Sequence, residues 1–440
     1  MAIRPQDIGL LQNRPFRRLV ESRAVGQIAQ NALLYSLLIL VVNKTESSIQ
    51  STLLVVAFIL PSIVLGIPAG ALAEILPRRA MLTLGYVLRS AAVGAMLFYR
   101  HDLWRVYLLV LGFSTVGQLT GPAESAALPR MVRSEQVAAA NSFFVLSVMV
   151  GQITGGVILA PLLLKSMGVE VTMGAAAALF LAAAVVVSGV AGLQGRHNGS
   201  QEGGGLSLGG ALAEGWRVLR SSRHAFTAMV YLTIAGTLVK SVAVLAPPFT
   251  RDVLRIEAEN TVFVVAPAAI GAMAALVLAP VLASLLGASR TAALGFFLLV
   301  LGLISLGLVV YVRDFMLDHV DLGISFVEER VGVSSVITVA MIIAIPVGFA
   351  ATVVGVAGKA VLNQEATEGT QARVFATQSA LSDALSLVPL FIVGMVADLV
   401  GVRSVLLAAA LAGLAVVMYL NLSGRLAPTA SATGGTIGVG

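Results

Sequence analysis

The sequence predicts an all-α integral membrane protein in which twelve transmembrane helices form two pseudo-symmetric bundles of six. Three observations predict this fold class: the composition, the length of the apolar runs, and one long polar interval between two sets of six runs. Of the 440 residues, 58% are hydrophobic and 11% are charged, and the mean hydropathy is +0.95. Because soluble domains carry about 25% charged residues, we expect lipid to surround most of this chain.

The apolar runs have the length of membrane-spanning helices. A helix needs about 20 mostly apolar residues to cross about 30 Å of hydrocarbon, whereas strands of a membrane barrel alternate over about ten residues. The runs here are long and continuous, which predicts helices. They cover residues 22–43, 51–73, 80–98, 105–127, 138–163 and 170–193, and then 225–248, 261–286, 291–312, 334–357, 375–397 and 402–422.

The polar interval divides the chain into an N-terminal bundle, residues 1–193, and a C-terminal bundle, residues 225–422. Residues 194–224 are predicted to form a cytoplasmic linker, flexible where it is rich in Gly and Ser. Its second part, "LAEGWRVLRSSRHAF", places Trp216 and Leu219 on one helical face, which is typical of an interfacial helix. Residues 423–440 are predicted to be a disordered tail.

The distribution of basic residues predicts the orientation. More arginines fall in the turns on the side of the N-terminus, among them Arg23, Arg78 and Arg79. By the positive-inside rule we expect both termini in the cytoplasm and a multi-pass protein in an inner (plasma) membrane. The acidic segment 314–329 is then an outer loop.

Several classes of function are excluded by the composition and by missing motifs. Basic residues are scattered between apolar runs rather than clustered on one face, so we expect no nucleic-acid binding. There is no cysteine, and the four histidines are far apart in sequence, so we expect neither a metal site nor a cofactor. No phosphate loop or H-E-x-x-H motif is present, so we expect no enzyme activity.

Polar residues inside the apolar runs are the candidates for function, because a charge in the bilayer is costly unless it faces a cavity or a partner. Lys240 and Asp383 are candidates for a pair in the C-terminal bundle, with Asp383 as a proton-coupling carboxylate. A fixed structural ion pair remains an open alternative. The other pathway candidates, for which gating or helix packing are both open, are Glu124, Gln30, Asn31 and Arg89.

A charged cluster lies between the second and third apolar runs, in "GALAEILPRRA", residues 70–80. An acid at the end of one helix and arginines at the start of the next can form a conformational latch, made in one state and broken in another. The candidate latch residues are Gly70, Glu74, Arg78 and Arg79. The alternative is that the arginines only set the topology and meet lipid phosphates.

The same cluster carries a family resemblance. "GALAEILPRR" resembles the signature G-x-L-A-D-R-x-G-R-[KR] of the major facilitator superfamily, with Glu74 in place of Asp and Pro77 in place of Gly. "NRPFRRL", "YVLRSA", "EGWRVLRSSRHAF" and "QARVFATQSALSDALSLVPL" are similar to segments of its macrolide-efflux and enterobactin-exporter branch. The resemblance implies the major facilitator fold and a secondary active transporter that exports a drug- or siderophore-like molecule by alternating access.

A glycine-rich segment extends this resemblance. "GQITGG" resembles the G-P-x-x-G-G element of drug/proton antiporters, with Gln152 in place of the proline. This similarity implies an antiporter and protons as a partner. From the residues alone, Gly151 and Gly155 form a GxxxG pattern that lets two helices approach closely, and Gly156 follows on the same segment.

A second resemblance gives an alternative substrate. "QNALLYSLLIL", "GPAESAAL" and "TLVKSVAVLAPP" are similar to segments of bacterial lysophospholipid transporters, with Lys240 kept. An alternative of another class is a non-transporting membrane receptor or assembly factor. The expected partners are a small amphipathic or lipid substrate, membrane lipids and protons, and we expect a monomer.

Overall fold

The computed structural model describes the backbone of residues 10, 12–75, 77–128, 131–133, 136–190, 208–319, 324–366 and 371–422. Side chains are described for the same residues except 66–75, 122, 125, 126, 137–139, 141, 142, 145, 208–212, 327, 331, 371–373, 376 and 421. In this part of the chain every regular element is a helix, as the sequence predicts. The linker start at 194–207 and the tail at 423–440 lie outside the described residues.

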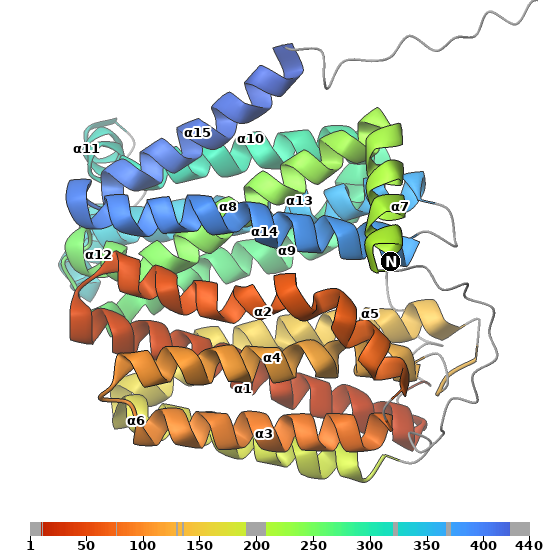
Figure 1. Ribbon diagram of the computed structural model, residues 1–440. Coiled ribbons are helices and arrows are strands. Elements are labelled where there is room, and N and C mark those ends of the chain that lie inside the picture. Colours follow the sequence, from red (N-terminus) through yellow and green to blue (C-terminus); the bar gives the residue numbers. More distant parts are fainter. Residues whose placement is uncertain are drawn as a thin grey trace, which may run out of the picture.

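The first half of the chain folds into one bundle of helices (Figure 1). Gly168, inside α6, has φ 84° and ψ 178°, a conformation that residues with a side chain rarely adopt. The chain reverses there, so one continuous helical segment supplies two membrane spans. The elements are α1 (Arg14–Thr45), α2 (Ser48–Ile75), α3 (Arg78–Phe98), α4 (Leu103–Ala127), α5 (Val137–Gly151), the π-helix η4 (Gln152–Leu159) and α6 (Ala160–Ser188).

The second half folds into a similar bundle after α7, a short helix that precedes it. Buried aromatic side chains lie at the centre of both bundles, Phe113 and Phe180 in the first and Phe296 in the second. The elements are α7 (Leu208–Ser221), α8 (Arg223–Asp252), the 3-10 turn η5 (Ala258–Thr261), α9 (Val262–Leu286), α10 (Ala288–Gly307), α11 (Val309–His319), α12 (Ile324–Val331), α13 (Ser335–Glu365), α14 (Gln371–Val400) and α15 (Val402–Leu422).

The helices have the lengths that twelve membrane spans require. Ten candidate spans are found in the described part of the chain by length and composition. One of them, Leu146–Ser188, has 43 residues and contains the reversal at Gly168, so it accounts for two crossings. Helix α4 has 25 residues, which at about 1.5 Å per residue is also enough to cross the hydrocarbon.

The segment predicted as an acidic outer loop is more ordered than the sequence indicated. It forms α11 and α12 rather than an irregular loop. Ile324 is buried against the second bundle, as is Val309 at the start of α11 just before the predicted loop, whereas Asp314, Asp318 and Glu328 are exposed. Each of these short helices has a buried apolar residue on one face and exposed charges on the other, as amphipathic helices do. In the sequence the many charges made this segment look like a loop.

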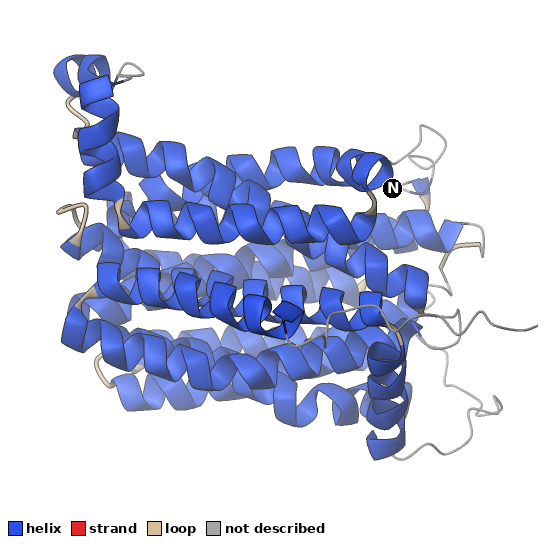
Figure 2. Ribbon diagram, turned by 90° about the horizontal axis from the view of Figure 1, so that it is seen from above, coloured by secondary structure: helices blue, strands red, loops and turns tan. Residues whose placement is uncertain are grey.

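Helix α7 runs across one end of the spanning helices in Figure 1, at the end where α1 begins. Leu219 is buried against α8, α13 and α14, whereas Trp216 remains 39% exposed. The amphipathic helix predicted in the linker is therefore present. We refer to this end as the α7 end, and to the opposite end, with α11, α12 and the α1–α2 turn, as the α11 end. Figure 2, a view from above, also has the helices running side by side between the two ends.

Close packing of the end of α5 and of η4 on α1 fixes one wall of the first bundle. A Cβ at Gly151 would overlap Gln27, and a Cβ at Gly155 would overlap the backbone carbonyl of Ile28. Gly156 is less constrained, since its Cβ would lie 3.7 Å from Cβ of Asn31. The GxxxG pair thus allows two backbones to approach where any side chain would separate them.

Candidate functional site

A polar cavity of about 400 Å³ lies between the two bundles. Helices α1, α2, α3 and α4 form most of its wall, and α8 closes it from the second bundle. A volume of this size is in the range of small-molecule sites. The polar side chains that line it are Arg23, Gln27, Gln30, Tyr86, Arg89, Ser114, Gln118, Thr120, Glu124 and Lys240.

Glu124 is the buried carboxylate of this cavity, with 4% of its surface exposed. The Tyr86 hydroxyl donates to Oε1 over 2.6 Å, and Arg23 forms an ion pair with Oε2. Tyr86 reaches this position because Gly26 leaves room for it: a Cβ at Gly26 would lie 2.7 Å from Cε1 of the tyrosine. Both carboxylate oxygens therefore have partners, which a buried charge requires.

Arg89 is the buried cation of the cavity, 6% exposed. Its Nη2 donates to Oε1 of Gln30 over 2.6 Å. The guanidinium carbon lies 4.2 Å from the ring centre of Phe113 and 4.8 Å from that of Phe180, and these aromatic rings stabilise the charge. Among the described residues no carboxylate forms an ion pair with Arg89, and its Nε has no hydrogen-bond partner.

Lys240 and Asp383 form the pair whose existence the sequence left open. Lys240 Nζ lies 2.6 Å from Asp383 Oδ1 and 3.0 Å from the Ser386 hydroxyl. The Ser62 hydroxyl, on α2 of the first bundle, donates to Asp383 Oδ2 over 2.8 Å. The side chains of Lys240 and Asp383 remain 25% and 28% exposed, so the cluster joins both bundles without being fully buried.

An apolar cavity of about 430 Å³ adjoins the polar one. It lies between α1 and η4 of the first bundle and α8, α9 and α13 of the second. Leu34, Leu38 and Ala243 line both cavities. Asn31 faces the apolar cavity, and its side-chain amide donates to the carbonyl of Gln27 over 2.8 Å.

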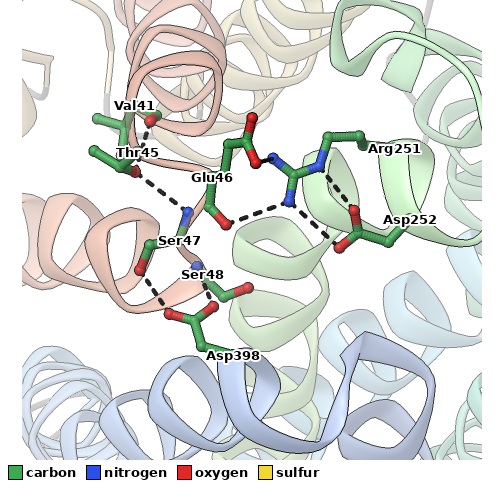
Figure 3. A network of polar contacts seen from close by, with 8 residues as sticks. All are labelled: Val41, Thr45, Glu46, Ser47, Ser48, Arg251, Asp252 and Asp398. Atoms are coloured by element: carbon green, nitrogen blue, oxygen red, sulfur yellow. Dashed lines mark hydrogen bonds and ion pairs between the residues drawn. The ribbon is translucent and has the colours of Figure 1, made fainter.

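The α11 end is closed by contacts between the bundles (Figure 3). Asp398, near the end of α14, accepts hydrogen bonds from the Ser47 hydroxyl over 2.6 Å, the Ser48 amide over 2.6 Å and the Ile49 amide over 3.2 Å. A carboxylate from the second bundle therefore caps the N-terminus of α2 in the first, where amides lack partners within the helix.

Further contacts at the α11 end continue this closure. Arg251, bonded to Asp252 through Nε over 2.7 Å, also donates to the backbone carbonyl of Glu46 over 3.3 Å (Figure 3). Asn43 donates to the Glu259 carboxylate over 2.6 Å. Residues of α8, η5 and α14 thus hold the α1–α2 turn.

The candidate latch is described only in part. The side chains of Gly70 and Glu74 lie outside the described residues, so the predicted contact between Glu74 and the arginines stays a prediction. Arg78 is buried at the start of α3, and Arg79 is half-buried beside Pro77, Thr83 and Ser188.

The structure assembles the other sequence candidates into one region. Gln30, Arg89, Glu124 and Lys240 line the polar cavity, and Asn31 lines its apolar neighbour. Sequence reasoning missed Ser62, Tyr86 and Asp398, and counted Arg23 only as an orientation signal. A serine or tyrosine in an apolar run gives no signal of its own, since its partner comes from a distant helix.

Comparison with known proteins identifies the family. The sequence profile of the Major Facilitator Superfamily matches residues 24–361, from α1 through most of α13. The chain belongs to the Major Facilitator Superfamily. Membership makes it a multi-pass secondary transporter, and its two bundles are the two halves of that fold. No curated protein sequence matches the chain.

Solved structures of this superfamily share the fold over nearly the whole chain. A mutant of the nucleoside transporter NupG has a TM-score of 0.72 at 10% identity, covering 93% of this chain and 99% of that one. A bacterial homologue of the human lysosomal transporter Spinster, inward-facing and unoccupied, has a TM-score of 0.70 at 13% identity, covering 94% and 97%.

Bacterial homologues of the iron transporter ferroportin match in two states. The inward-facing structure has a TM-score of 0.65 at 15% identity, covering 92% of this chain and 98% of that one. The outward-facing structure has a TM-score of 0.56 at 16% identity, covering 93% and 99%. At such identities the likeness concerns the fold alone.

Proposed function

We propose that this transporter exports an amphipathic small molecule across the inner membrane by alternating access. The observation that carries the proposal is the pair of adjoining cavities between the bundles, one polar and one apolar. An amphipathic molecule has two parts that match these two environments. The efflux direction rests on the resemblance of the sequence to the macrolide-efflux and enterobactin-exporter branch.

The arrangement corresponds to an inward-facing state if the α7 end is cytoplasmic. The positive-inside rule favours that orientation, and the α11 end is then the closed outer side. The higher TM-score of the inward-facing ferroportin homologue, 0.65 against 0.56, supports the same assignment. Export would begin with substrate entry from the cytoplasm or the inner leaflet.

Proton coupling through Asp383 is part of the proposal. Protonation of this carboxylate would weaken its ion pair with Lys240 and its hydrogen bond with Ser62 together. Because Ser62 belongs to the other bundle, one proton would alter a contact between the halves. A proton on Asp383 is therefore linked to the relative position of the two halves, which is what an antiporter needs.

A lysophospholipid transporter is the second candidate function. The cavity wall favours it in one respect, since Arg23, Arg89 and Lys240 outnumber the single carboxylate, Glu124, that lines the same space. A lipid phosphate would find partners there. Movement of a lysolipid down its gradient would need no proton, so the pH dependence of transport separates the two candidates.

The test is transport by the purified protein in liposomes. A pH gradient is imposed, and a fluorescent cationic drug and a labelled lysophospholipid are followed in parallel, with Lys240→Ala and Asp383→Asn as variants. Gradient-dependent drug movement that is lost in Asp383→Asn supports a proton-coupled exporter. Lipid movement without gradient dependence supports the lysophospholipid transporter.

Failure of both substrates to move would show that neither probe is the substrate, and water access to the cavity then separates a transporter of another molecule from the receptor or assembly-factor alternative. A receptor needs no water path to Lys240 or Asp383, so a cysteine at Ala243 would then resist water-soluble reagents.

The candidate latch of Gly70, Glu74, Arg78 and Arg79 is tested in the same liposomes with Glu74→Gln. We expect altered transport, and unchanged transport would leave the arginines as topology signals.

A further inference from the structure

Three cations, Arg23, Arg89 and Lys240, and one carboxylate, Glu124, line the polar cavity. Arg23 is paired with Glu124, and Lys240 is paired with Asp383, which does not line the cavity. Arg89 donates a hydrogen bond to the neutral Gln30 and packs against two aromatic rings. Glu124 attracts it electrostatically, but within the described residues the ion pair of Glu124 is made with Arg23 and not with Arg89. A buried guanidinium that forms no ion pair lowers the stability of the folded protein. Binding of an anion beside Arg89 would offset this cost, so the cavity favours an anionic ligand.

The two carboxylates near the cavity, Glu124 and Asp383, already have partners on both of their oxygens, which disfavours a cationic ligand. Both oxygens of Glu124 are engaged, by Arg23 and Tyr86. Both oxygens of Asp383 are engaged as well, by Lys240 and Ser62. A cationic group entering the described cavity would compete with these partners for the same carboxylates and would lie near three cations, whereas an anionic group would meet Arg89 without breaking an ion pair.

Helix α1 lies between the two cavities, and a different face of the helix lines each of them. Gln30 lines the polar cavity and its neighbour Asn31 lines the apolar one, because successive helical residues point about 100° apart. Leu34 and Leu38 border both. The far wall of the apolar cavity is formed mainly by aliphatic and Met side chains, among them Met149, Ile153, Val157, Val265 and Met273.

We propose that the ligand of this site is an amphiphile with an anionic headgroup, a carboxylate or a phosphate ester. Its oxygens bind Arg89 beside Gln30, and its apolar tail passes Leu34 and Ala243 into the apolar cavity. This inference rests on the proposed function, whose substrate class it narrows. A planar guanidinium suits both carboxylate and phosphate oxygens, so the experiment must separate these two headgroups.

The test is equilibrium binding to the full-length protein in nanodiscs. The probes share one dodecyl chain and differ in the headgroup: dodecanoate, dodecyl phosphate, dodecyltrimethylammonium and the uncharged dodecyl maltoside. We expect one of the two anions to bind at least about tenfold more tightly than the ammonium probe, the scale of one charge-assisted hydrogen bond. The tighter of the two anions identifies the headgroup.

Variants of Arg89 test the headgroup site. Arg89→Gln should lower affinity for the preferred anion by about tenfold or more and leave dodecyl maltoside unaffected, while Arg89→Lys should retain part of the preference. Arg105→Gln, at an exposed position, is the matched control. Gel filtration before binding verifies that each variant is folded. An equal or stronger affinity for the ammonium probe, or an unchanged anion preference in Arg89→Gln, would overturn the proposal.

A second pair of variants tests the tail site without touching a charge. Ala269→Phe fills the apolar cavity, and Ala274→Phe places the same side chain on an exposed position of the same helix. Only Ala269→Phe should weaken binding of the dodecyl anion relative to its butyl analogue. Equal effects of the two variants would contradict the tail assignment. Binding needs no gradient, so failed transport in liposomes and failed anion selectivity are separate results.

Discussion

The carboxylate of Asp398 accepts the backbone amide of Ser48 over 2.6 Å, across the interface between the two bundles. Intrahelical bonds cannot satisfy the first amides of α2, and here a residue of α14 does so. Opening the α11 end requires this cap to be lost. The closed state is therefore stabilised by a helix end and a charge from different halves.

Removing this cap should shift the protein toward opening at the α11 end. Asp398→Ala deletes all three hydrogen bonds, and because an N-cap side chain contributes about 1 kcal/mol, the open fraction should rise about fivefold. Spin labels at His101→Cys and His319→Cys report the separation by pulsed electron spin resonance. The chain has no native cysteine, so labelling is specific.

Asp318→Ala is the control for this measurement, since it removes an exposed carboxylate at the same end of the molecule. Asp398→Asn should give an intermediate result because the amide keeps one acceptor oxygen. Identical distance distributions in Asp398→Ala and the unmodified protein would show that the cap does not hold the closed state.

Lys240 and Asp383 should behave as a coupled pair. Each single variant, Lys240→Ala or Asp383→Asn, leaves the other residue between the bundles without its counterion, which destabilises the protein. The double variant should therefore cost less stability than the two single losses added together. Thermal unfolding in detergent measures this. Additive losses would mean that the two charges do not interact in solution.

The glycine contact between η4 and α1 should be intolerant of a methyl group. Gly155→Ala would push a Cβ into the carbonyl of Ile28, and overpacking of this kind costs about 1–3 kcal/mol. Gly174→Ala is the matched control, because a Cβ there meets no atom within 4 Å. We expect a lower melting temperature for Gly155→Ala alone, and similar melting temperatures would contradict the packing.

Tyr86→Phe should act on both stability and transport. It removes one hydrogen bond from the buried Glu124 and should cost about 1 kcal/mol or more. Tyr107→Phe removes a comparable hydroxyl, which donates to Gln50 outside both cavities. Both variants should melt earlier, but only Tyr86→Phe should alter transport. Normal transport in Tyr86→Phe would remove the tyrosine from the functional site.

The sequence predicted the membrane helices well because apolar length is a local property. Most of the apolar runs fall within helices of the structure, although run 291–312 covers the end of α10 and the start of α11, and run 170–193 ends beyond the described residues. The amphipathic pattern around Trp216 and Leu219 predicted α7. The first four residues of α11 lie in the predicted run 291–312, but the rest of α11 and α12 was not predicted as helical, because charged residues interrupt the apolar pattern. The chain reversal at Gly168 was expected between two runs, though not as one continuous helical segment.

The site was predictable only where a residue was unusual by itself. Lys240, Asp383 and Arg89 are charged residues in apolar helices, so the sequence alone marks each of them as unusual and as a candidate for function. Ser62 and Asp398 are ordinary in composition, and their roles depend on helices more than three hundred residues away in sequence. Long-range pairing of this kind follows from the packing of the two halves, which no local pattern encodes.

The central claim is that one cavity between the bundles opens to either side of the membrane in turn. Its most direct test is Ala243→Cys, at the border of both cavities, in oriented proteoliposomes treated with a membrane-impermeant maleimide from each side. The account predicts labelling from the α7 side at rest, with labelling from the α11 side rising in Asp398→Ala. Labelling from neither side, or from one side only in both proteins, would contradict alternating access through this cavity.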